Sequence, residues 1–232
     1  MHNDTQTKDT RHMSHFIPVI TLDGPAASGK GTIAERVAAA LGFHYLDSGA
    51  LYRIATLNAL RHGVPLDDAE ALTAAAQKLA PRFEGGRIYL EGDDVTTAIR
   101  SEEVSAATSR VAVVPGVRAA LFTLQKNAAR MPGLVADGRD MGTVVFPDAK
   151  LKIFMTASAR VRAERRWRQL IGRGESADLE ALTRDLEERD RRDSQRSTAP
   201  LRPAEDAKVL DTSDMGIEEV VKKVLLWWDE AR

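Results

Sequence analysis

A glycine-rich segment between an apolar run and a helix-like stretch constrains the fold of this chain more than any other feature. Residues 24–32 read Gly-Pro-Ala-Ala-Ser-Gly-Lys-Gly-Thr, after the apolar residues 19–22 and before the helix-like residues 33–38. Such a loop lets backbone N–H groups surround a phosphate, while a lysine adds charge and the helix N-terminus adds the positive end of its dipole. We therefore expect ATP or GTP to bind here. The residues expected to hold it are Gly24, Pro25, Ala26, Ala27, Ser28, Gly29, Lys30, Gly31 and Thr32.

The loop departs from the strict phosphate-loop pattern at one position. That pattern places Ser or Thr directly after the lysine, where the hydroxyl holds Mg²⁺. Gly31 occupies this place, and Thr32 follows one residue later. We therefore predict no direct protein ligand for a metal ion. A plain glycine turn between a strand and a helix is the alternative interpretation, which the agreement of strand, loop, lysine and helix disfavours.

Composition bounds what the rest of the chain does. The 232 residues contain no cysteine, which excludes disulfides, thiolate metal sites and cysteine nucleophiles and suits a reducing cytoplasm. Lys and Arg (33) nearly balance Asp and Glu (34), so the global charge indicates neither nucleic-acid nor membrane binding. No apolar run reaches the length of a membrane span. Residues 1–16 are predicted to be a disordered tail, in which His12 and His15 bind no metal.

Short apolar segments alternate with helix-like segments through much of the chain, which predicts an α/β fold with a parallel sheet. The five predicted strands are residues 19–23, 44–47, 134–137, 151–155 and 208–211. The predicted crossover helices are residues 29–41, 51–61, 159–171 and 217–228. In the last helix, apolar residues recur at the spacing of one helical face, so we expect that face to pack on the core. The predicted core domain comprises residues 17–63, 131–158 and 197–232.

Two segments interrupt the alternation. Residues 64–130 are predicted to be an insertion with helices at 69–79, 102–113 and 117–130 and a hairpin at 82–90 that turns at Gly85-Gly86. Residues 159–196 are predicted to be a lid of two arginine-rich helices, 159–171 and 178–196, joined by a short loop at Arg173-Gly174.

Polar residues follow two of the predicted strands and are expected at the same sheet edge as the glycine-rich loop. Asp47 and Ser48 begin one group, where a second substrate is expected; simple capping of a helix is the alternative. Asp137, Arg139 and Asp140 form the other group. Two carboxylates suggest acid–base chemistry, but the arginine between them favours anion binding. The combination fits phosphoryl transfer better than hydrolysis.

Arginines also cluster on the predicted lid. Arg189, Arg192, Asp193 and Arg196 share one helical face, and like charges on one face repel unless anions lie opposite. Arg162, Arg165 and Arg166 form a similar cluster on the preceding helix. We predict that the two clusters close over a triphosphate and neutralise charge on the transferred group. A solvated helix face and a nucleic-acid patch are the alternatives; the latter lacks interleaved aromatic residues apart from Trp167.

With these residues in view, the chain resembles the bacterial cytidylate kinase family of nucleoside monophosphate kinases. The resemblance rests on residues 24–32, 46–53, 136–147 and 188–196 and covers the chain from Pro18 onward. It implies transfer of the γ-phosphoryl group of ATP to CMP or dCMP, with Mg²⁺ bound mainly through phosphates and water. It also implies a P-loop NTPase-type five-stranded parallel sheet flanked by helices, an enlarged monophosphate-binding insertion and a helical lid.

The resemblance assigns roles residue by residue. It implies that Arg53, Arg139 and Arg196 bind the CMP phosphate, that Tyr52 and Ser48 line the same pocket, and that Asp137 lies with them. Ser109, Arg118 and Asp140 match positions that read the cytosine edge, and Arg189 and Asp193 match positions near the sugar. Arg162 and one of Arg165 or Arg166 match lid groups on ATP. The implied catalytic residues are Lys30, Arg139, Arg189 and Arg196.

One residue departs from the family's pattern, and two other functions are alternatives to the one that the resemblance implies. Ala27 stands where relatives often have glycine, which we expect to stiffen the loop slightly. A kinase of another acceptor, such as UMP or a sugar acid, is the first alternative, and a nucleotide-dependent switch is the second. The switch is disfavoured because the chain has no Asn-Lys-x-Asp motif for reading guanine. We expect a cytoplasmic monomer whose partners are its nucleotide substrates, with neither nucleic acid nor membrane among them.

Overall fold

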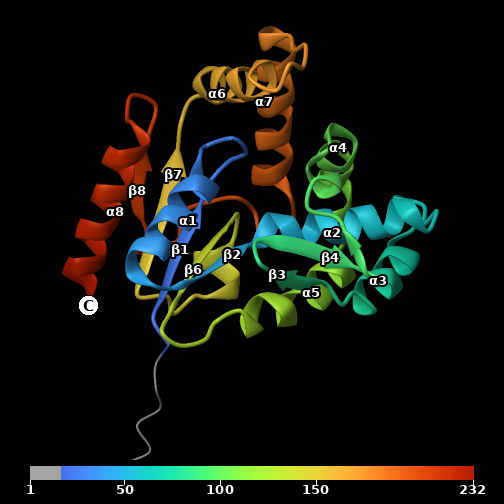
Figure 1. Ribbon diagram of the computed structural model, residues 1–232, viewed down its shortest axis with the longest axis horizontal. Coiled ribbons are helices and arrows are strands. Elements are labelled where there is room, and N and C mark those ends of the chain that lie inside the picture. Colours follow the sequence, from blue (N-terminus) through green and yellow to red (C-terminus); the bar gives the residue numbers. More distant parts are fainter. Residues whose placement is uncertain (1–16) are drawn as a thin grey trace, which may run out of the picture.

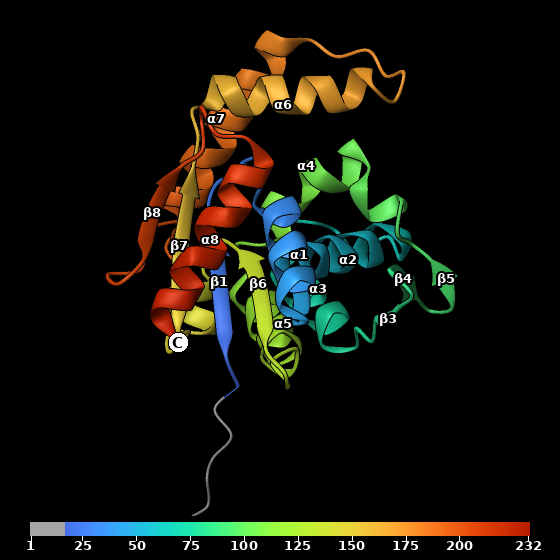
Figure 2. The ribbon, with the colours of Figure 1, turned by 60° about the vertical axis from the view of Figure 1, so that its left-hand side comes forward.

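The computed structural model describes residues 17–232 and has a five-stranded parallel sheet at its centre (Figures 1 and 2). The predictions of an α/β fold and of all five strands are confirmed. The strand order is β2-β6-β1-β7-β8, and every neighbouring pair is parallel. The strands are β1 (Val19–Asp23), β2 (His44–Asp47), β6 (Leu134–Gly138), β7 (Leu151–Thr156) and β8 (Lys208–Asp211).

Alternate residues of the central strands face two separate apolar layers. Ile20 and Leu22 of β1 pack with helices α1 (Lys30–Leu41) and α8 (Ile217–Ala231). Val19, with Leu134 and Ala136 of β6, packs on the opposite side with α2 (Ser48–Arg61). Both sheet faces are therefore covered, as parallel sheets require. The predicted apolar face of α8 is also confirmed, since Val220, Val221, Val224 and Trp228 are buried.

The insertion folds beside the sheet and belongs to the same apolar layer as α2. Its hairpin turns through Gly85 and Gly86, whose φ angles of 56° and 75° suit glycine. The residues 93–94 add a third short strand that the sequence analysis did not predict. The elements are α3 (Ala69–Gln77), β3 (Arg82–Glu84), β4 (Arg87–Leu90), β5 (Asp93–Asp94), the 3₁₀ turn η1 (Ala98–Arg100), α4 (Glu102–Val111) and α5 (Pro115–Asn127).

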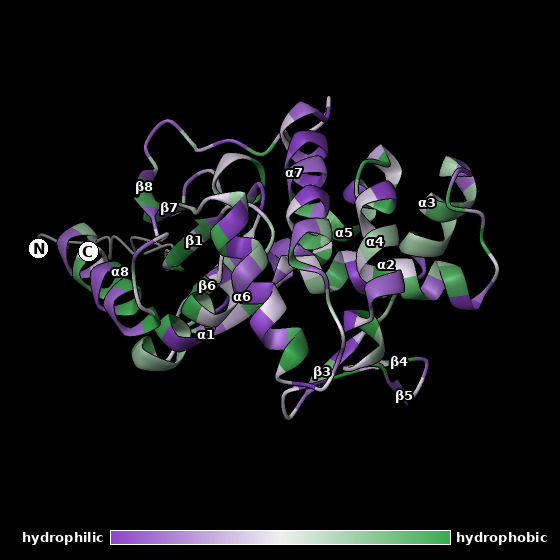
Figure 3. Ribbon diagram, turned by 90° about the horizontal axis from the view of Figure 1, so that it is seen from above, coloured by the Kyte–Doolittle hydropathy of each residue, from purple (hydrophilic) through white to green (hydrophobic). Residues whose placement is uncertain are grey.

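The two helices of the predicted lid, α6 (Ala159–Ile171) and α7 (Leu179–Gln195), lie above the carboxyl ends of the strands (Figure 1). Side chains of Ser158 and Asp178 cap their N-termini by accepting backbone N–H bonds. Figure 3 shows that α7 is hydrophilic along most of its length, and none of its residues is buried. Ion pairs such as Arg162–Asp190 and Arg139–Asp193 tie this helix to α6 and to the loop after β6.

Two helix boundaries near the site need correction, and one turn was not predicted. Helix α2 begins at Ser48 rather than at 51, because the Asp47 carboxylate accepts the Ala50 N–H at 2.9 Å and caps it. Helix α7 ends at Gln195, so Arg196 lies just outside it in extended backbone. A π-turn, η2 (Met141–Val145), follows β6 and was not predicted. Within residues 17–232, no helix is long and apolar enough to cross a membrane. The predictions for His12 and His15 lie outside the described residues.

Candidate active site

Three loops at the carboxyl ends of neighbouring strands surround one cleft of about 680 Å³. The glycine-rich loop follows β1, Asp47 and Ser48 follow β2, and residues 138–140 follow β6, which lies between them in the sheet. The insertion and the lid supply the remaining walls, through α4 and α7 among others. Parallel strands thus bring distant segments of the sequence to one edge, as expected for this type of sheet.

The glycine-rich loop is tightly constrained. A Cβ on Gly24 would lie 2.2 Å from the carbonyl oxygen of Met155, so only glycine fits there. Ala27 has a φ of 59°, in the left-handed region that costs a non-glycine residue on the order of 1–2 kcal/mol. The Ala27 departure therefore adds local strain as well as stiffness. The Ser28 hydroxyl is buried without a hydrogen-bond partner among the described residues. A buried hydroxyl in this state favours the binding of a ligand that accepts its hydrogen bond.

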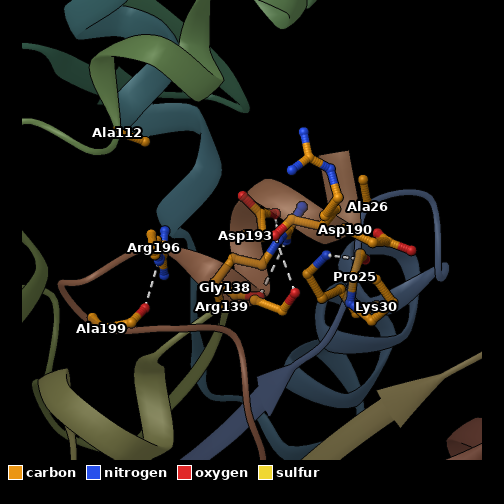
Figure 4. Close-up of polar contacts among 12 residues, drawn as sticks. Pro25, Ala26, Lys30, Ala112, Gly138, Arg139, Asp190, Asp193, Arg196 and Ala199 are labelled. Carbon is orange, nitrogen blue, oxygen red and sulfur yellow. Dashed lines mark hydrogen bonds and ion pairs between the residues drawn. The ribbon is translucent and has the colours of Figure 1, made fainter. Parts of the chain in front are cut away.

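Lys30 begins α1 and points back into the loop. Its Nζ donates a hydrogen bond to the Pro25 carbonyl oxygen at 3.0 Å (Figure 4). Burial, and next the charge of Arg139, lower the pKa of Lys30 to about 7. A bound phosphate would restore the positive charge, because an anion stabilises the protonated amine. Lys30 is thus placed to respond to a phosphate ligand.

Asp137 explains why glycine follows the lysine. A Cβ on Gly31 would lie 3.1 Å from Asp137 Oδ2, so the carboxylate already occupies the space beside the loop. Burial, and next the charge of Asp47, raise the pKa of Asp137 to about 7. The Tyr45 hydroxyl donates to the same oxygen at 3.5 Å. This buried carboxylate at the loop is the group that a nearby cation would most stabilise.

The three residues predicted around the acceptor base come together on one side of the cleft. Arg118 forms an ion pair with Asp140, and both side chains are at most 10% exposed. The Arg118 guanidinium also lies 5.7 Å from the Tyr52 ring centroid, within cation–π range. Ser109 lines the cleft as well, with its hydroxyl donating to the Ala106 carbonyl oxygen.

Arginines from three segments converge between this region and the glycine-rich loop. Arg139 bonds Asp193 at 3.0 Å, while Arg196 donates to the Ala199 carbonyl oxygen (Figure 4). Burial lowers the pKa of Arg53 and of Arg196, and it lowers the pKa of Arg189 to about 10. One nitrogen each of Arg189 and Arg196 is buried without a partner among residues 17–232. Half-buried, incompletely paired guanidinium groups favour the binding of anions.

The lid arginines are placed differently from the expectation. Arg162 does not line the cleft: it is 3% exposed and donates to the carbonyl oxygens of Ala157 and Ala26. It also pairs with Asp190 of α7, so it ties both lid helices to the glycine-rich loop. Arg165 bonds the Thr212 carbonyl oxygen, and Arg166 lines the cleft in an ion pair with Glu102. In this conformation all three arginines contact protein groups.

Sequence analysis missed several partners of the site residues. In the sequence, nothing distinguishes Asp190 and Glu102 from acidic residues on any helix surface. Their arginine partners are identified only in the folded structure. Asp23 had a detectable signal, since it ends a predicted strand at the edge where the other site residues lie. No group of three His, Cys, Asp or Glu side chains in the described part of the chain is arranged to hold a metal ion.

Comparisons with known proteins agree over nearly the whole chain. A family model for cytidylate kinase matches residues 20–229. The cytidylate kinase of Bordetella bronchiseptica is 59% identical over 211 residues, which cover 91% of this chain and 95% of the relative. That of Chromobacterium violaceum is 55% identical over 214 residues, with 92% and 96% covered. Among solved structures, a gluconokinase from Sinorhizobium meliloti covers 93% of each chain at 15% identity and a TM-score of 0.49, which carries no argument about the substrate.

Proposed function

The chain belongs to the cytidylate kinase family, and we propose that it transfers the γ-phosphoryl group of ATP to CMP or dCMP, giving ADP and CDP or dCDP. One observation carries this proposal most directly. The cleft joins a phosphate-binding loop at one end to the Arg118–Asp140–Tyr52 group at the other, with half-buried arginines between. A site for two anionic substrates needs this distribution of charge.

The acceptor phosphate would lie among Arg53, Arg139 and Arg196, and Ser48 would line the same pocket. These guanidinium groups neutralise two phosphate groups that otherwise repel each other. An oxygen of the CMP phosphate then bonds to the γ-phosphorus as the bond to the bridging oxygen of ADP breaks. Lys30 and the loop N–H groups stabilise the charge that spreads over the transferred group. Arg189 lies beside the same path and Asp193 holds Arg139 in place.

The base would lie against the Arg118–Asp140 pair. A carboxylate accepts a hydrogen bond from the 4-amino group of cytosine, whereas uracil presents an oxygen acceptor at that position. Ser109 adds a hydroxyl that donates or accepts. Acceptor selection thus depends mainly on Asp140.

We also propose that Mg²⁺ enters with ATP, bound to its phosphates and to water. The ion would offset phosphate charge during transfer. The residues fit this mode because Gly31 has no side chain to bind a metal directly. The buried Asp137 carboxylate beside it would accept hydrogen bonds from the ion's water molecules. ATP and the cytidine nucleotide are the proposed partners of a monomer that works in a reducing compartment such as the cytoplasm, which the absence of cysteine suits.

A panel of acceptors tests the proposed function. The purified chain with ATP and Mg²⁺ is offered CMP, dCMP, UMP, AMP and gluconate, and ADP release is measured by a coupled assay. We expect the highest kcat/KM for CMP and dCMP. Faster turnover of gluconate or UMP would assign the cleft to another acceptor, and no turnover with any of them would contradict a kinase function. Omission of Mg²⁺ should abolish turnover.

A further inference from the structure

Asp23, the last residue of β1, makes two hydrogen bonds to a segment 118 and 119 residues away in the sequence. Its Oδ1 accepts the Met141 N–H at 2.8 Å, and its Oδ2 accepts the Gly142 N–H at 2.7 Å. The side chain is buried, as are both donors. No role was assigned to this residue by the sequence analysis or by the mechanism above.

The two donors are the first N–H groups of η2. The opening N–H groups of a helical turn have no partner within the turn, so a side chain usually caps them. Asp140, the residue before η2, makes no such cap. Asp23, at the end of β1, supplies both acceptors. Among the described residues, its side chain is the one that bonds the first N–H groups of η2 and so anchors this turn to the sheet.

The position of Asp23 connects the two substrate-binding loops. Gly24 follows it directly and opens the phosphate-binding loop. Arg139 and Asp140 directly precede the N–H groups that it binds, and Asp140 in turn pairs with Arg118. One carboxylate thus lies between the loop for the donor nucleotide and the loop for the acceptor.

We propose that Asp23 is a positioning residue that fixes the acceptor loop, residues 138–142, against the phosphate-binding loop. Through the backbone of this loop, Asp23 holds Arg139 toward the acceptor phosphate and Asp140 toward the base. This proposal rests on the proposed function. Asp23 is not among the described residues that line the cleft, so its effect would pass through the residues that do.

The two loops depend on Asp23 unequally. The phosphate-binding loop has other anchors, because Lys30 bonds Pro25 and Arg162 bonds Ala26. Gly24 also packs directly on the Met155 backbone. The side chains of Arg139 and Asp140 pair with Asp193 and Arg118, but the first backbone N–H groups of η2 bond to Asp23. Loss of the carboxylate should therefore impair the acceptor side much more than the ATP side.

Asp23→Asn tests this asymmetry, because the amide keeps the shape but offers one acceptor and turns an N–H donor toward a backbone N–H. We expect KM for CMP to rise at least tenfold while KM for ATP changes less than twofold, and the kcat/KM preference for CMP over UMP to narrow. Calorimetric dissociation constants for each nucleotide should show the same split without requiring turnover. Val224→Ala on α8 is the control, because it destabilises the core at a buried residue that is not among those lining the cleft.

The control should lower the melting temperature and leave both KM values and the CMP to UMP ratio unchanged. If Asp23→Asn raises both KM values equally, or lowers only the melting temperature as the control does, Asp23 is a structural residue and the proposal is wrong. If that variant does not fold, Asp23→Ser, which removes the buried charge and keeps one oxygen, is judged by the same criteria. Failure of the wild-type chain to phosphorylate CMP would instead contradict the proposed function, separately from the binding split.

Discussion

Asp137 fills the space beside Gly31, where a Cβ would approach its Oδ2 to within 3.1 Å. This contact accounts for the departure from the strict phosphate-loop pattern. A serine or threonine at position 31 would compete with the carboxylate for the same space. The chain therefore keeps an acidic group at the loop and leaves metal binding to phosphate and water oxygens in our account.

Gly31→Ser should consequently weaken the enzyme rather than improve its metal binding. The new side chain pushes the Asp137 carboxylate away from the loop, and we expect kcat/KM for Mg-ATP to fall about tenfold. Steady-state kinetics at varied Mg²⁺ concentration measure this. Gly216→Ala is the matched control, since a Cβ there meets nothing within 4 Å and should leave the kinetics unchanged. Higher activity of Gly31→Ser would contradict our interpretation of the contact.

Lys30→Ala should reduce kcat by a factor of about 100 or more, because Lys30 stabilises charge on the transferred phosphoryl group. The melting temperature should not fall, since Lys30 is buried and a buried cation lacks full solvation. Kinetics and thermal unfolding of the purified variant check both parts. A kcat near the wild-type value would mean that the phosphate-loop assignment is wrong.

Arg196→Ala should lower kcat/KM for CMP by a factor of about 10 to 100, with little loss of thermal stability. Arg196 lies in the cleft with one nitrogen that has no partner among residues 17–232, whereas Arg191 is exposed and bonds Glu188 of α7 at 2.7 Å. Arg191→Ala is therefore the control, and it should change neither quantity appreciably. Similar losses in the two variants would remove Arg196 from the acceptor site.

The raised pKa of Asp23 predicts that this residue makes the folded chain less stable as the pH rises. Burial raises this pKa from 3.8 to about 6, so the folded chain retains a proton that the unfolded chain has lost between these values. The stabilisation of the folded state that results from this raised pKa is fully present below pH 3.8. It is lost as the pH rises through about 6, and the free energy of unfolding falls by about 3 kcal/mol in total. Asn does not titrate. Urea unfolding of wild type and Asp23→Asn at pH 4.5 and 7.5 should show the wild type losing relative stability with rising pH.

The central sheet and the glycine-rich loop between β1 and α1 agree with the sequence-based prediction, for a physical reason. Buried parallel strands are continuous apolar runs, and a loop between a strand and a helix has few conformations that hold a phosphate. Predictions that relied on a longer helical pattern were less accurate at the ends. Arg196 was placed on a helical face, yet the helix ends one residue earlier.

Tertiary contacts between distant charged residues could not be predicted from one sequence. The pairs Arg162–Asp190 and Arg166–Glu102 depend on how the lid, the insertion and the core meet. The turn η2 could not be predicted either, because its starting N–H groups are capped by Asp23 from another strand rather than by a neighbour. Most of the charged side chains that line the cleft were named from their chemistry, but the groups that hold them were not.

The CMP to UMP ratio of kcat/KM, measured for wild type and Asp140→Asn, tests the central claim most directly. A buried acceptor facing another acceptor costs on the order of 1–3 kcal/mol, so wild type should prefer CMP strongly. Asn also donates a hydrogen bond, so the variant should narrow the preference about tenfold or more. A thermal melt of the variant would show whether weakening the Arg118–Asp140 ion pair also destabilises the fold. A wild-type chain that uses CMP and UMP equally, or a ratio that Asp140→Asn leaves unchanged, would contradict the account.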